Sequence, residues 1–138
     1  MMEIKKGKVL MAYKEDIKHR GFLDWLKAHT SFVKPLHRYE GNITLSDEKI
    51  VFDGKDKKTK NDCAIEINKI DVTDIYLGFD DVFKRGEERS LGISFQPLRI
   101  VFSKDEKEYI LYLIIDFNRL LRATKNKEWY EELKKWRG

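Results

Sequence analysis

The clearest pattern in the chain is an alternation of apolar and polar residues, which is the period of a strand with one buried face. It first appears in GNITLSDEKIVF, residues 41–52. Ile43 and Leu45 precede the polar turn SDEK, and Ile50 and Phe52 follow it on the same face. This arrangement predicts a β-hairpin.

The rest of the chain continues the strand pattern, with polar turns between the segments. Alternation predicts strands at 65–67, 75–79, 91–95 and 98–102, after an earlier strand at 8–13. Residues 109–116, YILYLIID, are apolar at almost every position, so we expect a strand that is covered on both faces. Residues 68–74 are expected to form a turn or a single helical turn, and SKDEKE is expected to form a second hairpin turn.

Two segments show helical spacing instead. Phe22, Leu26 and Val33 are among the apolar positions that share one helical face, and Pro35 blocks a continuation, so we predict a short helix near 22–30.

The helical pattern is clearest at the end of the chain. Trp129, Leu133 and Trp136 are spaced i, i+4 and i+7, which predicts an amphipathic helix with one apolar stripe. Asn126 is the predicted N-cap of this helix. About seven short strands and one terminal helix predict an α+β domain, in which a curled antiparallel sheet forms a sandwich or a partly open barrel capped by the helix. The length of 138 residues fits a single domain, residues 1–138.

Four stretches carry a resemblance to a known family: GKVL at 7–10, GNITLSDEKIVF at 41–52, IEINKI at 65–70 and the helical segment 126–136. Together they resemble the PH-like superfamily, and more closely its GRAM-type and bacterial PH-like domains. The resemblance implies two antiparallel sheets capped by a C-terminal helix, and a binding module rather than an enzyme. It also implies that a loop between early strands could hold phosphorylated head groups.

Composition narrows the range of functions. The net charge is only +4 and acidic and basic residues are mixed, so no basic stripe typical of nucleic-acid binding is present. The single cysteine, Cys63, excludes a disulfide within the chain and fits a reducing compartment. The N-terminal sequence has no apolar run that resembles a signal peptide. We therefore expect a cytoplasmic protein that can also associate with the membrane periphery.

Signatures of catalysis and metal binding are missing from the sequence. It contains no nucleophile elbow, phosphate-binding loop or dinucleotide fingerprint. His19, His29 and His37 are too widely spaced for a typical zinc site, and Cys63 stands beside Asp62, which disfavours a thiolate. We predict no catalytic residues, no metal site and no cofactor.

Two segments are candidates for binding. The first is the lysine loop, the lysine-rich stretch 55–60, which contains Lys55, Lys57, Lys58 and Lys60. Three nearby aspartates reduce its net charge to about +1, and the flanking strand positions lack an arginine. We expect a solvated loop tip, and only a weak anion or membrane site as the alternative.

The second candidate is the segment 21–38, whose apolar content is high for a connection. One helical face can plug the open end of the barrel, but Leu23 and Trp25 lie on neighbouring faces. We therefore predict a partner-binding surface formed by Leu23, Trp25, Phe32 and Leu36.

These observations favour a non-enzymatic binding module that engages a protein partner or an anionic membrane surface. Self-association through strand edges or through residues 21–38 fits the same interpretation. A small nucleic-acid-binding barrel and an enzyme without a recognisable motif stay open as alternatives.

Overall fold

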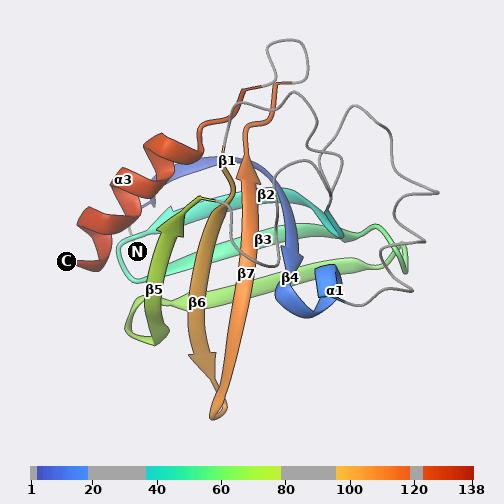
Figure 1. Ribbon diagram of the computed structural model, residues 1–138, viewed down its shortest axis with the longest axis horizontal. Coiled ribbons are helices and arrows are strands. Elements are labelled where there is room, and N and C mark those ends of the chain that lie inside the picture. The colour runs from blue at the N-terminus through green and yellow to red at the C-terminus, as the bar shows by residue number, and fades with distance from the viewer. Residues whose placement is uncertain (1–2, 19–36, 79–95, 119–122) are drawn as a thin grey trace.

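The computed structural model describes residues 3–18, 37–78, 96–118 and 123–138 (Figure 1). These residues form seven strands, two α-helices and one short 3-10 helix. The elements are β1 (Glu3–Tyr13), α1 (Lys14–Lys18), β2 (Tyr39–Ser46), β3 (Lys49–Asp56), β4 (Asp62–Asn68), η1 (Lys69–Asp71), β5 (Val72–Leu77), β6 (Leu98–Lys104), β7 (Lys107–Ile115) and α3 (Asn126–Arg137).

The strands form one antiparallel sheet in the order β4-β3-β2-β1-β7-β6-β5. Figure 1 shows that β2, β3 and β4 run across the direction of β5, β6 and β7, while the long strand β1 belongs to both halves. Among the described strands β4 and β5 remain the two ends of the order, so the curled sheet is not closed. The expected α+β architecture is therefore confirmed as an open, curled sheet with a C-terminal helix.

Most predicted strands are found with longer bounds. The hairpin at 41–52 is β2 and β3, and the turn expected at 68–74 contains η1. The strand predicted at 91–95 and the helix predicted near 22–30 lie outside the described residues. The helix α1, five residues long, was not predicted, because it is too short to show helical periodicity.

The two hairpin turns predicted from the sequence are stabilised in different ways. In the turn between β2 and β3, the Ser46 hydroxyl donates to the Lys49 carbonyl at 3.0 Å. In the turn between β6 and β7, Asp105 and Glu106 both have positive φ angles, 51° and 64°. Two successive left-handed residues give the turn a twist that matches the strands beside it.

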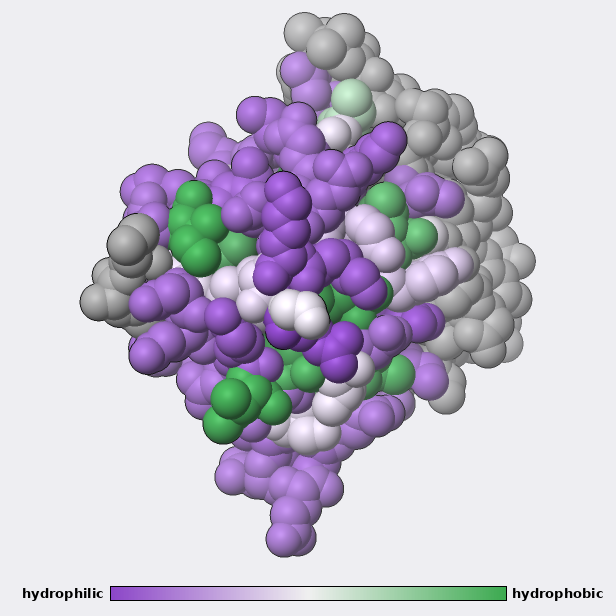
Figure 2. Space-filling model, turned by 90° about the vertical axis from the view of Figure 1, so that its left-hand side faces the viewer, coloured by the Kyte–Doolittle hydropathy of each residue, from purple (hydrophilic) through white to green (hydrophobic). Residues whose placement is uncertain are grey.

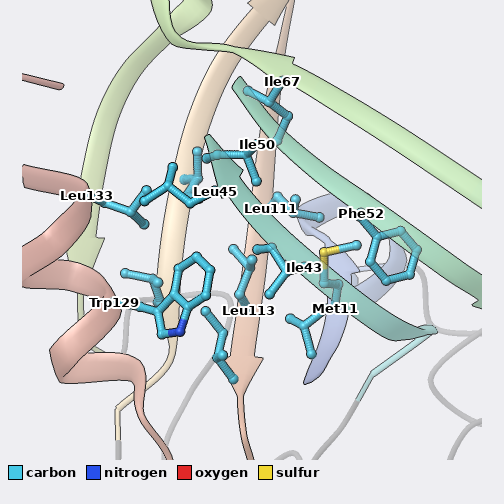
Figure 3. Packing of buried hydrophobic residues seen from close by; sticks show 14 of the residues in the cluster. Met11, Ile43, Leu45, Ile50, Phe52, Ile67, Leu111, Leu113, Trp129 and Leu133 are labelled. Carbon is cyan, nitrogen blue, oxygen red and sulfur yellow. The ribbon is translucent and has the colours of Figure 1, made fainter. Parts of the chain in front are cut away.

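The core lies inside the curl of the sheet (Figure 3). Alternate residues of every strand contribute to it, including Met11 on β1, Phe52 on β3 and Leu111 on β7. Strand β7 is buried on both faces, because Tyr112 and Ile114 on its outer side are as inaccessible as the core residues. The prediction of a strand covered on both sides is therefore confirmed.

Helix α3 closes one end of this core. Trp129, Leu133 and Trp136 are buried, as their spacing predicts, and Trp129 points inward in Figure 3. The Trp136 indole N–H donates to the Ser46 carbonyl at 2.7 Å, which ties the last turn of α3 to the end of β2.

The prediction that Asn126 caps α3 was wrong. The side chain of Asn126 makes no capping bond, because it is buried and bonds to the sheet instead. Its oxygen accepts the backbone N–H of Ile115 at 2.7 Å, and its nitrogen donates to the carbonyls of Gln96 at 2.7 Å and Leu113 at 3.1 Å. A buried amide with these bonds fixes the start of the helix against β7.

Candidate binding site

The candidate site is a cavity of about 490 Å³ where β1 passes into α1. Figure 1 shows that α1 lies on the side of the molecule away from α3. We call this cavity the tyrosine cavity. Its lining residues come from β1, α1, the start of β2 and the start of β7: Tyr13, Lys14, Glu15, Asp16, Arg38, Tyr39, Glu108, Tyr109 and Ile110. A cavity of this size is large enough for one or two side chains of a partner.

Aromatic rings form the apolar part of the cavity. The Tyr13 ring meets the Tyr39 ring edge-on, with 5.9 Å between the ring centroids. The centroid of the Tyr109 ring is 6.0 Å from that of Tyr13. Behind them Tyr109 stacks on Phe102 at 5.3 Å, and Tyr39 meets Phe52 at 6.4 Å. The tyrosines are thus held by the core, and the cavity is preformed rather than dependent on mobile side chains.

An arginine clamp supports the cavity from the side of β2. The Arg38 guanidinium donates from Nε at 3.1 Å and from Nη2 at 2.8 Å to the two oxygens of Asp56. Its Nη1 donates to Asp16 at 2.7 Å, and the guanidinium lies 5.3 Å from the centre of the Tyr39 ring. Asp16 also accepts the backbone N–H of Tyr13 at 3.1 Å, so the clamp joins α1, β2 and the end of β3.

Burial and the arginine clamp together shift the pKa values of Asp56, Tyr13 and Cys63. Burial by itself would raise the pKa of Asp56, but hydrogen bonds from Arg38 and from the backbone N–H groups of Lys58 and Thr59 bring it below its ordinary value of 3.8. Burial raises the pKa of Tyr13 to about 12, and the nearby Cys63 and Asp16 add to the effect. Burial and Asp56 also raise the pKa of Cys63, so the thiol is not activated.

The lysine loop begins beside this clamp. Asp56 accepts the backbone N–H of Lys58 at 2.9 Å, and the backbone N–H of Lys57 donates to the Arg38 carbonyl at 2.8 Å. These bonds fix the loop to the start of β2. The strands that flank the loop carry no arginine, but Arg38 reaches Asp56 at the start of the loop from eighteen positions earlier.

The charges of the lysine loop are largely matched by acidic neighbours. Lys55 pairs with Asp62 at 3.2 Å, and Lys57 pairs with Glu40 at 3.3 Å. Since Arg38 is held by two carboxylates, it adds little attraction for an outside anion. Lys58 also interacts with its surroundings, so it is not a free charge either.

The rim of the tyrosine cavity carries more negative than positive charge. Among the lining residues Glu15, Asp16 and Glu108 are acidic, whereas Lys14 and Arg38 are basic. Asp56 adds a further carboxylate behind Arg38. An approaching group would therefore meet an apolar floor of tyrosine rings and a weakly acidic edge.

A second cavity, of about 360 Å³, lies where β1, β2 and β7 meet. Val9, Leu10, Ile114 and Phe117 supply its apolar walls, and Lys8, Glu40 and Asn42 supply polar ones. It has no aromatic cluster like that of the tyrosine cavity, and we regard it as the weaker candidate.

The predicted partner-binding residues Leu23, Trp25, Phe32 and Leu36 lie outside the described residues, as do His19 and His29. The ends of the segment that contains them are described. Helix α1 ends at Lys18 and the chain resumes at His37, so Asp16 and Arg38 of the clamp stand close to the two ends of this segment. His37 is buried with its Nε2 3.8 Å from a Glu40 oxygen.

The described residues contain neither a candidate metal site nor a helix that could span a membrane. No group of three His, Cys, Asp or Glu side chains in the described ranges is arranged to hold a metal ion. Within the same ranges, no helix has the length and apolar character needed to cross a membrane. Comparison of the sequence with protein-family models and with curated proteins gives no match.

Proposed function

We propose that the chain is a non-enzymatic binding module of the PH-like type, and that the tyrosine cavity receives a side chain of a protein partner. Support for the PH-like type comes from the strand order, from the two crossing halves of the sheet and from the C-terminal helix over one end of the core. In this proposal the module acts in the cytoplasm, where Cys63 stays a thiol.

The observation that carries the proposal is the preformed set of Tyr13, Tyr39 and Tyr109, with Arg38 beside Tyr39. Tyrosine and arginine are the residue types enriched at binding hot spots, because they offer a large rigid surface together with polar atoms. The weakly acidic rim favours a partner segment that combines a basic residue with an aromatic or aliphatic one.

A membrane surface is the weaker candidate. The lysine loop would supply the attraction, but Lys55 and Lys57 are paired with carboxylates. Each basic residue near an anionic membrane is worth about 1 kcal/mol, so a loop whose lysines are largely matched by acidic neighbours gives only weak and salt-sensitive binding. The acidic rim equally disfavours nucleic acid.

The test is selection from a random peptide library displayed on phage, with the purified chain as bait. We expect enriched peptides with a basic and an aromatic or aliphatic residue in close sequence. A synthetic copy of the best peptide should bind about tenfold more weakly to the double variant Glu15→Lys/Glu108→Lys, which reverses the charge of two exposed rim residues.

Controls separate the cavity from general effects. Glu131→Lys changes an exposed glutamate on α3 and should leave peptide binding unchanged. Tyr109→Ala should weaken binding at least as much as the rim variant, whereas Tyr76→Ala, on the far strand β5, should not. If no peptide is enriched, or if the chain binds anionic vesicles tightly instead, the proposed protein partner is refuted.

A further inference from the structure

Strand β4 is one of the two edge strands of the described sheet. Within the described residues β4 pairs with β3 alone, which leaves its other side as a sheet edge. Ala64 and Glu66 are exposed, and Ile65 on the inner face is only half-buried although it packs against the core. An edge strand without a covering element is a template for another strand.

The direction of the backbone groups of β4 follows from its register. The pairing places Gly54 opposite Cys63 and Phe52 opposite Ile65. Just beyond this ladder the Asp56 N–H donates to the Asn61 carbonyl at 2.9 Å, so these two residues form a hydrogen-bonded pair. The pairs Gly54–Cys63 and Phe52–Ile65 follow at steps of two residues and are of the same kind.

Hydrogen-bonded and non-hydrogen-bonded pairs alternate in an antiparallel ladder. Cys63, Ile65 and Ile67 therefore direct their backbone groups toward β3, whereas those of Ala64 and Glu66 point outward.

We propose that a second copy of this chain adds to this edge, antiparallel to β4, with Ile65 of the two copies facing each other across a two-fold axis. In this register Cys63 lies opposite Ile67 of the other copy, so the inner face is apolar along its whole length. On the outer face Asp62 lies opposite Asn68, and Ala64 lies opposite Glu66. The sheet then continues through both copies.

Charge favours this register over its neighbours, although within each copy Glu66 is paired with Lys49 and Asp62 with Lys55. If at least five residues of each strand are paired, the outward backbone groups allow symmetric registers centred on Ala64, on Ile65 or on Glu66. A centre at Ala64 would place Asp62 opposite Glu66, and a centre at Glu66 would place two glutamates opposite each other. Like charges directly opposite destabilise a strand pair. Only the register centred on Ile65 avoids both contacts.

The contrast with the other sheet edge supports an interface at β4. Strand β5 is covered by α3, and the Arg137 guanidinium donates to the Thr73 carbonyl of β5 at 2.8 Å. No described element covers β4 in this way. Beside the end of β4, Ile70 is 91% exposed, and the proposed register brings it toward the Asp62 end of the second copy's β4.

The first test is a cysteine cross-link in the full chain, in a Cys63→Ser background. A pair that faces itself in a non-hydrogen-bonded position has Cα atoms about 4.5 Å apart, within the range of a disulfide. Ile65→Cys should therefore form a covalent dimer on mild oxidation. Glu66→Cys should not, because its copies stand diagonally at about 7–8 Å.

The second test is charge at Ala64, measured by sedimentation over a range of concentrations. Ala64→Glu faces Glu66 of the other copy and should weaken the dimer about fivefold. Ala64→Lys faces the same carboxylate and should strengthen it. The two substitutions change the affinity of the dimer in opposite directions only if Ala64 and Glu66 are opposite each other.

Both variants should first melt at nearly the temperature of the parent chain, since position 64 is exposed. A seven-residue strand edge is a small interface, so we expect a dimer that dissociates on dilution. A chain that stays monomeric up to about 1 mM would overturn the proposal. So would a dimer in which Ile65→Cys does not cross-link, because its interface would lie elsewhere.

Discussion

The two ends of the core are closed in different ways. At one end α3 inserts Trp129 and Leu133, which are fully inaccessible and bring no charge into the core. At the other end three tyrosines line a cavity, and one of them, Tyr39, lies beside Arg38, which is held by Asp16 and Asp56. The first end is stabilised by burial of apolar surface, whereas the second retains a cavity and polar groups.

Under the proposed function, the two ends have different roles. The surface on the α3 side is mostly hydrophilic, and its apolar residues form small separate patches (Figure 2). Such scattered residues are ordinary for a protein surface. A paired arginine beside tyrosines costs desolvation, and that cost is not needed to close a core. We therefore interpret the α3 end as structural and the tyrosine end as the binding end.

The largest effect should come from the structural end. Trp129→Ala removes a side chain with no exposed surface and should lower the free energy of unfolding by about 3–5 kcal/mol. Thermal and urea denaturation measure this change. The matched control is Tyr130→Ala on the same helix, which removes a half-buried ring and should cost clearly less. An unchanged melting temperature for Trp129→Ala would show that the helix is not part of the core.

Asn126→Ala should cause a smaller loss in the free energy of unfolding. The substitution leaves the buried Ile115 N–H without its side-chain partner, at about 1–3 kcal/mol for an unsatisfied group. Urea denaturation should show a destabilisation of about 2 kcal/mol or more. Asn42→Ala, at an exposed position of β2, is the control and should change little. Equal effects would mean that the buried amide is not an anchor.

At the tyrosine end the clamp should make the stability of the fold depend on pH in the acid range. The pKa of Asp56 is lowered in the folded chain, so its contribution is present above the ordinary value of 3.8 and is lost as the pH falls through the lower folded value. Asp56→Asn should therefore be less stable than the parent at neutral pH, and the difference should shrink as the pH falls below 3.8. Melting curves against pH measure this. Asp53→Asn, an exposed neighbour on β3, should not show the pattern.

The smallest effect should appear only in alkali. The pKa of Tyr13 is raised to about 12, so its contribution is complete below the ordinary value of 10 and is lost as the pH rises from 10 toward 12. Tyr13→Phe should lose less stability than the parent over this interval. Titration of tyrosinate absorbance in both proteins gives the difference for this one residue. A Tyr13 that titrates near 10 would contradict its burial.

The sequence predicts the α3 end of the core better than the tyrosine end. The stripe of Trp129, Leu133 and Trp136 is local, since helical spacing alone places the three side chains on one face. The clamp is not local, because Arg38 meets carboxylates eighteen and twenty-two positions away. Periodicity finds the strands that carry these residues, but it does not say which charged side chains meet at their ends.

The error at Asn126 has a similar cause. Asparagine before a helix is typical of an N-cap, and the local sequence contains nothing against that interpretation. The competing partners are backbone groups of β7 and of Gln96, thirty positions earlier, which become available only after the sheet has formed. Tertiary hydrogen bonds thus replaced the local one.

The most direct measurement is a chemical-shift map of the isotope-labelled chain during titration with the peptide selected from the library. If the tyrosine end is the binding end, backbone and side-chain signals of Tyr13, Arg38 and Tyr109 should shift with saturation, while those of Trp129 and Trp136 stay in place. Shifts centred on α3, with the tyrosine cavity unchanged, would contradict the division between a structural and a binding end.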